Sequence, residues 1–390
     1  MLCLHGFFLY PGGAELSSRM ERRLMDRLFT NCTIGSLALP NRLVRSATAE
    51  HMADEAGRPR EQLGRLYADL VRGGVGLIIT GHMYVHPAGK CHNEMTGIYT
   101  DELIPDLRTL ADGVHALGGL VIAQINHGGM DASADSVHDP MAPSSFEAEW
   151  LKRPARAMTD AEIDEVIEAY AAAARRAQRA GLDGVQIHAA HGYLVSQFLS
   201  PAVNRRTDRW GGDIEGRMLL LRRICSRVRD QVGPDYPVIT KLGLADRIEG
   251  GLALAEGLQV VAALEEMGLD AVEISAGIGG KKSASIWPGI RREGDEAYFR
   301  DWSRQARQRT RLPILLVGGM RSRAVMEDVL ASGDADLISM SRPLICEPDL
   351  PQRLRTGQQT RSSCISGGRC WAEAEGVGIS CKCPLEHRTT

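Results

Sequence analysis

Short apolar runs alternate with longer amphipathic stretches along this chain from about residue 40 to residue 342. Apolar runs of about four to eight residues are typical of buried strands, and apolar residues three or four apart are typical of helices. The pattern predicts eight strands, at residues 42–49, 75–81, 120–127, 184–190, 238–243, 271–277, 314–320 and 337–342. It predicts helices between them at residues 61–72, 104–117, 160–180, 214–232, 253–267, 295–309 and 321–331.

Residues that begin and end helices support these boundaries. Thr159 precedes the helix predicted at 160–180 and stands three residues before Glu162, which is the spacing of a capping box. Glycines that suit a left-handed helix cap precede four of the predicted strands, at Gly181, Gly233, Gly268 and Gly333.

Strand–helix alternation repeated eight times predicts an α/β fold of the (β/α)8 TIM-barrel type rather than a doubly wound sheet. No G-x-G-x-x-G motif follows the first strand, which weakens the dinucleotide-binding alternative. We expect one barrel domain at residues 26–358. A poorly ordered N-terminal extension at 1–25 and a short cysteine-containing tail at 359–390 complete the expected organisation.

Composition narrows the classes of function. The 390 residues are 44% hydrophobic, enough for a large core, and the net charge of −3 gives no electrostatic reason to bind nucleic acid or an anionic membrane. The apolar stretch at 2–10 is too short to span a bilayer and lacks the basic start of a signal peptide. Nine scattered cysteines without such a signal predict a cytoplasmic protein with no disulfide framework. The sequence leaves the oligomeric state open, and a homo-oligomer is possible.

Polar residues gather where the predicted strands end, which is where the chemistry of a TIM barrel collects. His188, His191 and Tyr193 follow the fourth strand directly, and two imidazoles with a phenol favour a ligand site over a loop with satisfied histidines. His82, Gln124 and Lys241 lie at or near the ends of the second, third and fifth strands. The sequence therefore predicts a polar ring at the mouth of the barrel.

The last two strands carry the features of a phosphate site. Gly318 and Gly319 end the seventh strand, and Ser341 and Arg342 end the eighth. Paired glycines let backbone amides approach phosphate oxygens, and a guanidinium binds the same oxygens. A tight turn and a surface ion pair would explain these residues separately, but their joint position favours phosphate binding.

Four segments resemble a known family. The runs at 41–48, 123–129, 188–201 and 204–212 strongly resemble the Old Yellow Enzyme family of NAD(P)H:flavin oxidoreductases, and the resemblance extends from about residue 28 to residue 356. It implies non-covalent FMN, with NADH or NADPH as the electron donor. It implies that the FMN site is formed by Ser46, Ala47, Thr48, Ala49, His82, Gln124, Lys241, Gly318, Gly319, Ser341 and Arg342.

The resemblance also implies roles and a reaction. Gln124 would bind the pyrimidine edge of the flavin, Lys241 would lie near its N1 atom and C2 carbonyl, and the residues after strands seven and eight would bind the phosphate. Hydride would pass from reduced flavin N5 to the β-carbon of an α,β-unsaturated carbonyl compound. His188 and His191 would donate hydrogen bonds to the carbonyl oxygen, and Tyr193 would protonate the α-carbon.

Departures from the family pattern leave some points open. Ala49 stands where many relatives carry Thr or Cys, so a hydrogen bond to the flavin is missing unless Thr48 supplies it. His82 stands at a position that is small in many relatives, and His51 stands where some relatives have a substrate-side Tyr.

The tail cysteines raise the question of a metal. Longer relatives resembling 2,4-dienoyl-CoA reductase hold a four-iron cluster in this region, but Gly367 occupies the place of a second ligand cysteine. We therefore expect no metal and no iron–sulfur cluster, and ordinary free thiols at Cys364, Cys370, Cys381 and Cys383.

Other functions stay open beside the ene-reductase. They are a 2,4-dienoyl-CoA-reductase-like or demethylase-like flavoenzyme, a flavin-free phosphate-binding lyase that uses Lys241 for a Schiff base, and a non-catalytic binding protein. The sequence names neither the physiological substrate nor the choice between NADH and NADPH.

Overall fold

The computed structural model describes residues 26–149, 151–278 and 285–383. The N-terminal extension expected at 1–25 lies outside these residues, as does the end of the tail at 384–390.

Eight parallel strands form a closed barrel, which confirms the predicted TIM-barrel fold. Each strand pairs with the next one along the chain, and the last pairs with the first. The strands are β3 (Leu43–Arg45), β4 (Leu77–Tyr84), β5 (Val121–Asn126), β8 (Val185–Ala189), β9 (Val238–Gly243), β10 (Ala271–Ser275), β11 (Ile314–Val317) and β12 (Leu337–Met340). β3 and β11 end earlier than predicted. In β11 the cause is the backbone of Gly318, whose φ of 135° leaves the extended region.

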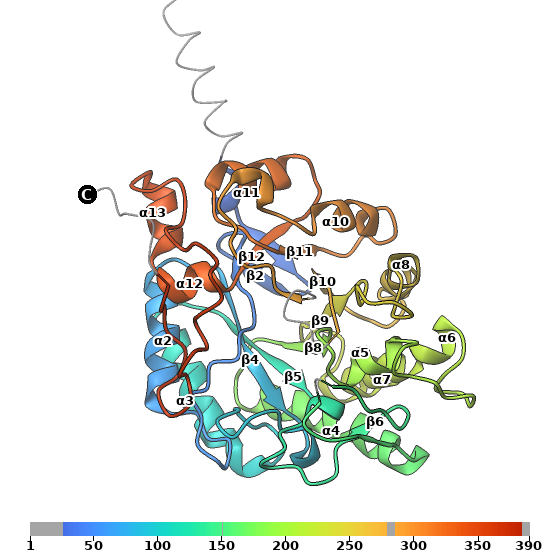
Figure 1. Cartoon of the computed structure of the whole chain (residues 1–390). Helices are drawn as coiled ribbons and strands as arrows, with labels where there is room; N and C mark the ends of the chain where they lie inside the picture. The colour runs from blue at the N-terminus through green and yellow to red at the C-terminus, as the bar shows by residue number, and fades with distance from the viewer. Residues whose placement is uncertain (1–25, 150, 279–284, 384–390) are drawn as a thin grey trace, which may run out of the picture.

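Helices surround the strands (Figure 1). They are α2 (Glu61–Arg72), α3 (Ile104–His115), α4 (Asp160–Arg179), α5 (Leu194–Leu199), α6 (Ile214–Arg217), α7 (Leu219–Val232), α8 (Leu254–Ala263), α10 (Arg300–Arg307), α11 (Arg323–Ala331), α12 (Arg342–Cys346) and α13 (Leu350–Thr356). Short 3-10 turns occur at η1 (Arg27–Phe29), η2 (Pro87–Gly89), η3 (Asp101–Leu103), η4 (Gly129–Asp131) and η5 (Glu293–Asp295). The single helix predicted at 214–232 is wrong in one respect, because Met218 separates α6 from α7.

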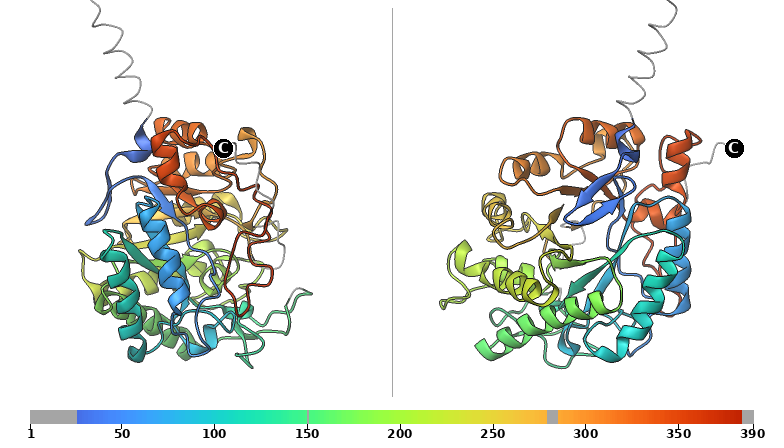
Figure 2. Two further views of the ribbon diagram at one scale, coloured as in Figure 1. Left: turned by 90° about the vertical axis from the view of Figure 1, so that its left-hand side faces the viewer. Right: turned by 180° about the vertical axis from the view of Figure 1, so that it is seen from behind.

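A hairpin that the sequence did not predict covers the end of the barrel where the strands begin. It pairs β1 (Cys32–Ile34) with β2 (Leu37–Leu39), and it faces the viewer in the right-hand panel of Figure 2. Ile34 and Leu39 pack in one buried cluster with barrel residues such as Val44 and Leu315. Each strand has only three residues, too few for an alternating pattern to be recognised. A second short pair, β6 (Met141–Ala142) with β7 (Arg156–Ala157), lies between β5 and α4.

The predicted helix boundaries are confirmed where side chains define them. The Thr159 hydroxyl accepts from the Glu162 amide, and the Glu162 carboxylate accepts from the Thr159 amide, so α4 begins with a complete capping box. The four predicted cap glycines have φ between 71° and 83°. None of the helices in the described ranges is long and apolar enough to cross a membrane.

Candidate active site

All of the residues predicted for the site line one cavity at the carboxyl ends of the barrel strands. The cavity has a volume of about 270 Å³, near the lower end of the range for small-molecule sites. The eight strands therefore bring together side chains that are almost 300 residues apart in the sequence, from Ser46 to Arg342.

His188 is fixed as a hydrogen-bond donor to the cavity. It lies in β8 with 3% of its surface exposed, and its Nδ1 accepts from the Ala190 amide at 3.3 Å. Burial, with the neighbouring His191, His82 and Lys241, holds its pKa well below the usual value, so the ring is neutral at pH 7. Since Nδ1 is the acceptor, the single ring proton sits on Nε2.

His191 lies beside it in a left-handed backbone conformation, with φ of 65°. Its Nε2 is 2.7 Å from the Ser275 hydroxyl at the end of β10, and its ring centroid is 5.1 Å from that of His188. Burial and the charge of Lys241 lower its pKa to about 3. The site thus presents two neutral imidazoles side by side.

Tyr193 lies between two of the histidines at the start of α5. Its ring centroid is 4.9 Å from that of His188 and 5.0 Å from that of His82. Burial raises its pKa well above the usual value, so the phenol keeps its proton at neutral pH. The His82 ring forms one wall beside it, with its Nδ1 3.0 Å from the side-chain Nδ2 of Asn126, and burial lowers the His82 pKa to about 4.

Lys241 in β9 lies on the cavity floor and contacts two polar side chains, one from the neighbouring strand β10 and one that follows β3 on the opposite side of the barrel. Its Nζ donates to the Ser46 hydroxyl at 2.9 Å and lies 3.3 Å from a carboxylate oxygen of Glu273. The sequence analysis missed Glu273, which appeared as a single charge inside an apolar strand. Gln124 lies on the same floor and donates to the Gln186 side chain at 2.7 Å.

The loops after β11 and β12 retain free groups for an anion. The backbone amides of Gly319 and Arg342 have no hydrogen-bond acceptor among the described residues, and neither does the buried Ser339 hydroxyl. The Arg342 guanidinium donates to the carbonyl oxygens of Ser366 and Trp287, and no carboxylate of the described residues pairs with it.

The glycines also have a packing role. A Cβ at Gly318 or Gly319 would lie 3.0–3.1 Å from the Tyr298 ring. Free amides and an unneutralised guanidinium fit the phosphate of FMN, and the Gln124 and Lys241 side chains offer hydrogen-bond donors to its ring, so these residues are able to hold it.

The C-terminal tail supplies part of the wall, which the sequence analysis did not predict. Ser366 and Trp371 line the cavity, and the Trp371 indole N–H donates to the carbonyl oxygen of Ala49 at 3.0 Å. The Thr48 hydroxyl, considered as a substitute for the missing group at Ala49, instead lies 2.8 Å from the Ser341 hydroxyl.

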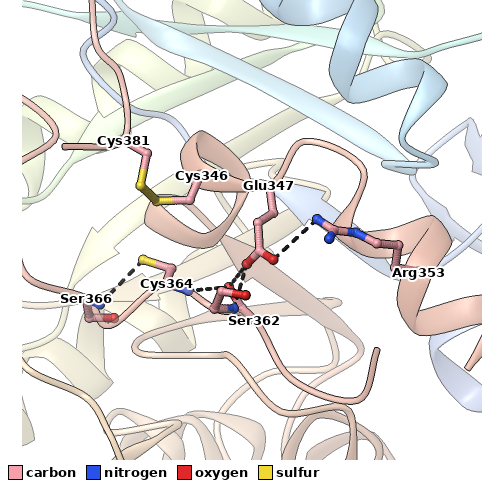
Figure 3. The surroundings of a disulfide bond; sticks show 8 residues. Cys346, Glu347, Arg353, Ser362, Cys364, Ser366 and Cys381 are labelled. Carbon is pink, nitrogen blue, oxygen red and sulfur yellow. Dashed lines mark hydrogen bonds and ion pairs between the residues drawn. A yellow bond between two sulfur atoms is a disulfide. The ribbon is translucent and has the colours of Figure 1, made fainter. Parts of the chain in front are cut away.

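The expectation of four free tail thiols is wrong for one of them. Cys381 forms a disulfide with Cys346 at the end of α12, and the bridge lies close to Cys364 (Figure 3). Sequence reading grouped Cys381 with its near neighbours, because it could not show that the chain passes back beside α12.

The donor set does not fit an iron–sulfur cluster. Cys381 is spent in the disulfide, and a Cβ at Gly367 would lie 2.7 Å from the Cys383 sulfur, where a second ligand would have to stand. Within the described ranges, no group of three or more His, Cys, Asp or Glu side chains is placed to hold a metal ion.

His51 lies outside the main cavity. Its ring stacks on His92 at a centroid distance of 3.9 Å, and both rings line an adjacent cavity that also contains Asp131. Burial raises the pKa of Asp131 to about 7. Contact of His51 with a substrate remains a prediction.

Known proteins resemble this chain over most of its length. The NADH:flavin oxidoreductase / NADH oxidase family matches residues 27–361. A curated "NADH oxidase" of Thermoanaerobacter brockii is 34% identical over 343 residues, which are 87% of this chain and 52% of the relative. The chain thus spans about half the length of the first curated relatives that it matches.

Solved structures give the same picture. A 2-naphthoyl-CoA reductase in complex with 2-naphthoyl-CoA superimposes with a TM-score of 0.84 at 28% identity, over 92% of this chain and 56% of that one. An Old Yellow Enzyme homologue from Zymomonas mobilis superimposes with a TM-score of 0.74 at 26% identity, over 87% of this chain and 95% of that one.

Proposed function

Because the chain belongs to the NADH:flavin oxidoreductase / NADH oxidase family, which includes the Old Yellow Enzymes, we propose that it reduces the activated C=C bond of α,β-unsaturated carbonyl compounds. This is a family of FMN oxidoreductases with relatives named for NADH and for NADPH. FMN held by the residues lining the cavity would supply the redox chemistry, which is hydride transfer between the nicotinamide and the alkene.

One observation carries the proposal: a fixed neutral donor and a protonated phenol face the same cavity. When a hydride adds to the β-carbon of an enone, negative charge develops on the carbonyl oxygen. His188 presents its Nε2–H to the cavity without taking up a proton, as an oxyanion donor must. The retained proton of Tyr193 is then available for the α-carbon.

The cofactor side of the proposal rests on the remaining lining residues. Ser46, Ala47, Thr48 and Ala49 would lie beside the flavin, Gln124 would bind its pyrimidine edge, and Lys241 would lie near its N1 atom and C2 carbonyl. Gly318, Gly319, Ser341 and Arg342 would bind the phosphate. His82 would close the side next to Tyr193.

A Schiff-base lyase is less well supported. Such an enzyme needs a neutral, free amine, whereas Lys241 is held between the Glu273 carboxylate and the Ser46 hydroxyl. The substrate class extends to conjugated thioesters, because a thioester carbonyl develops charge on the same oxygen. The 2-naphthoyl-CoA complex of the structural relative is an example of such a ligand.

The test is an anaerobic two-step experiment on the FMN-loaded protein. The protein is first reduced with NADH or NADPH and then mixed with 2-cyclohexenone, a nitroalkene or an enoyl thioester while flavin absorbance is followed. Cyclohexanone, which lacks the alkene, and cyclohexene, which lacks the carbonyl, are matched controls. We expect rapid reoxidation with the activated alkenes alone and a saturated product. Reoxidation by dioxygen but by none of the activated alkenes would refute the proposal.

A further inference from the structure

A closed network of buried polar side chains lies at the floor of the cavity, where Ser46, Gln124 and Lys241 line it, and continues beneath the floor. The Glu273 carboxylate accepts from the Ser46 hydroxyl at 2.6 Å and from the Gln186 amide at 3.0 Å, and it pairs with Lys241 at 3.3 Å. Lys241 donates in turn to Ser46 at 2.9 Å. Gln124 extends the network by donating to Gln186.

The barrel register explains why these groups meet. Glu273 in β10 is paired directly with Lys241 in β9, and Gln186 in β8 is paired with Gln124 in β5. Glu273 and Gln186 have no exposed surface, and Lys241 has 3%. No water therefore screens the carboxylate from the ammonium group. The electrostatic potential at the cavity is the sum of their two opposite contributions, and each contribution is large because the surroundings are dry.

We propose that Glu273 sets the reduction potential of bound FMN by partly cancelling the charge of Lys241. The inference rests on the proposed placement of Lys241 near the N1 atom and C2 carbonyl of the flavin. A cation at that place stabilises the negatively charged reduced ring relative to the neutral oxidised ring. A carboxylate 3.3 Å from the cation opposes this effect, so Glu273 lowers the potential and favours transfer of hydride onward from the flavin.

The main test is Glu273→Gln, which keeps the shape of the side chain and removes its charge. The reduction potential is measured by equilibration with a reference dye, and the affinities for oxidised and reduced FMN are measured separately. We expect the preference for reduced FMN to rise at least tenfold, which for a two-electron couple is a potential about 30 mV more positive.

Gln186→Met is the matched control, because Gln186 does not line the cavity, and the substitution removes the 3.0 Å hydrogen bond to the same carboxylate and changes no charge. We expect its preference for reduced FMN to change less than threefold. An equal shift in both variants would mean that the geometry of the network, and not charge, sets the potential. A Glu273→Gln potential that is unchanged or more negative would overturn the proposal as well.

A second pair keeps the test decisive if Glu273→Gln alone fails to hold FMN. Lys241→Gln is compared with the double variant Lys241→Gln/Glu273→Gln, in which neither buried charge remains. Removing the carboxylate in this background should again make the potential more positive, and no difference within the pair would overturn the inference. The reduction potential of FMN in Lys241→Gln should itself be more negative than in the unaltered protein. If it is not, the placement of Lys241 near the flavin N1 atom fails, whatever the alkene assay shows.

Discussion

Replacement of His188 by alanine tests the proposed reaction most directly. The ring is almost fully buried and presents one N–H to the cavity, so the substitution removes one donor to the developing oxyanion. Loss of one such donor costs about 2.7–4 kcal/mol, or roughly 100- to 1,000-fold in rate. Because the space left by the ring can admit a water molecule, we expect the lower end of this range, about 100-fold.

The assay is the reoxidation of the reduced protein by 2-cyclohexenone in an anaerobic stopped-flow instrument. Reoxidation by dioxygen is the internal control, since it requires no donor to a carbonyl oxygen and should change little. His188→Asn, whose amide retains an N–H, should fall between His188→Ala and the unaltered protein. A loss of less than threefold with the enone, or an equal loss with dioxygen, would refute the assigned role.

The substitution also has a structural cost that must be separated from the chemical one. The Ala190 amide loses its acceptor, and an unsatisfied buried N–H costs about 1–3 kcal/mol of stability. Thermal unfolding and the absorbance of bound FMN measure this cost independently. A variant that keeps its FMN and unfolds above the assay temperature gives an interpretable rate.

Three further predictions follow from the described contacts. Tyr193→Phe should slow turnover of 2-cyclohexenone about 100-fold and leave reoxidation by dioxygen unchanged, because only the alkene needs a proton on carbon; a loss of less than threefold in the stopped-flow rate would contradict it. His127 has no exposed surface, and its pKa is lowered to about 3 by burial and by His86, below the value near 6.5 of an unfolded chain. Above pH 6.5 this difference has little effect on stability, because His127 is then largely neutral in the unfolded chain too. As the pH falls from 6.5 to 5, the unfolded chain takes up the proton and the folded state does not, so the free energy of unfolding should fall by about 2 kcal/mol. Urea unfolding at several pH values measures this fall, and His127→Asn should reduce it. Cys346→Ser should lower the free energy of unfolding by about 4 kcal/mol, since the bridge to Cys381 closes a loop with a separation of 35 residues; dithiothreitol should lower the stability of the unaltered protein to the same level, and no effect of the reductant would contradict the bridge.

The barrel could be predicted from the sequence because all eight strands appear as apolar runs and four of them are marked a second time. An apolar run identifies the strand, and a glycine such as Gly181 or Gly268, whose left-handed conformation the structure confirms, marks the end of the preceding helix. The ring of polar residues could be predicted once the barrel was predicted, since the carboxyl ends of the strands in a closed parallel barrel share one face. The hairpin β1–β2 escaped because its three-residue strands carry no period.

The tail could not be predicted in the same way. Its described residues, 359–383, form no helix or strand, so neither spacing nor period shows where this segment runs. Trp371 reaches the cavity through a hydrogen bond to Ala49, 322 residues earlier in the chain, and Cys381 pairs with a cysteine in α12 rather than with its neighbours. Contacts of this kind depend on the path of an irregular segment, which a single sequence does not specify.

Glu273 is different, because a physical signal for it was present. A lysine in an apolar strand cannot be buried without a partner, since a desolvated charge that is left unpaired costs several kcal/mol or more. Consecutive strands of this barrel are neighbours, so the first place to look for the partner of Lys241 was the middle of the next strand, where Glu273 stands at the paired position. The interpretation of Lys241 as a cation near the flavin N1 atom was therefore incomplete: the charge that would act on the ring is that of the pair, and the carboxylate has to be counted with it.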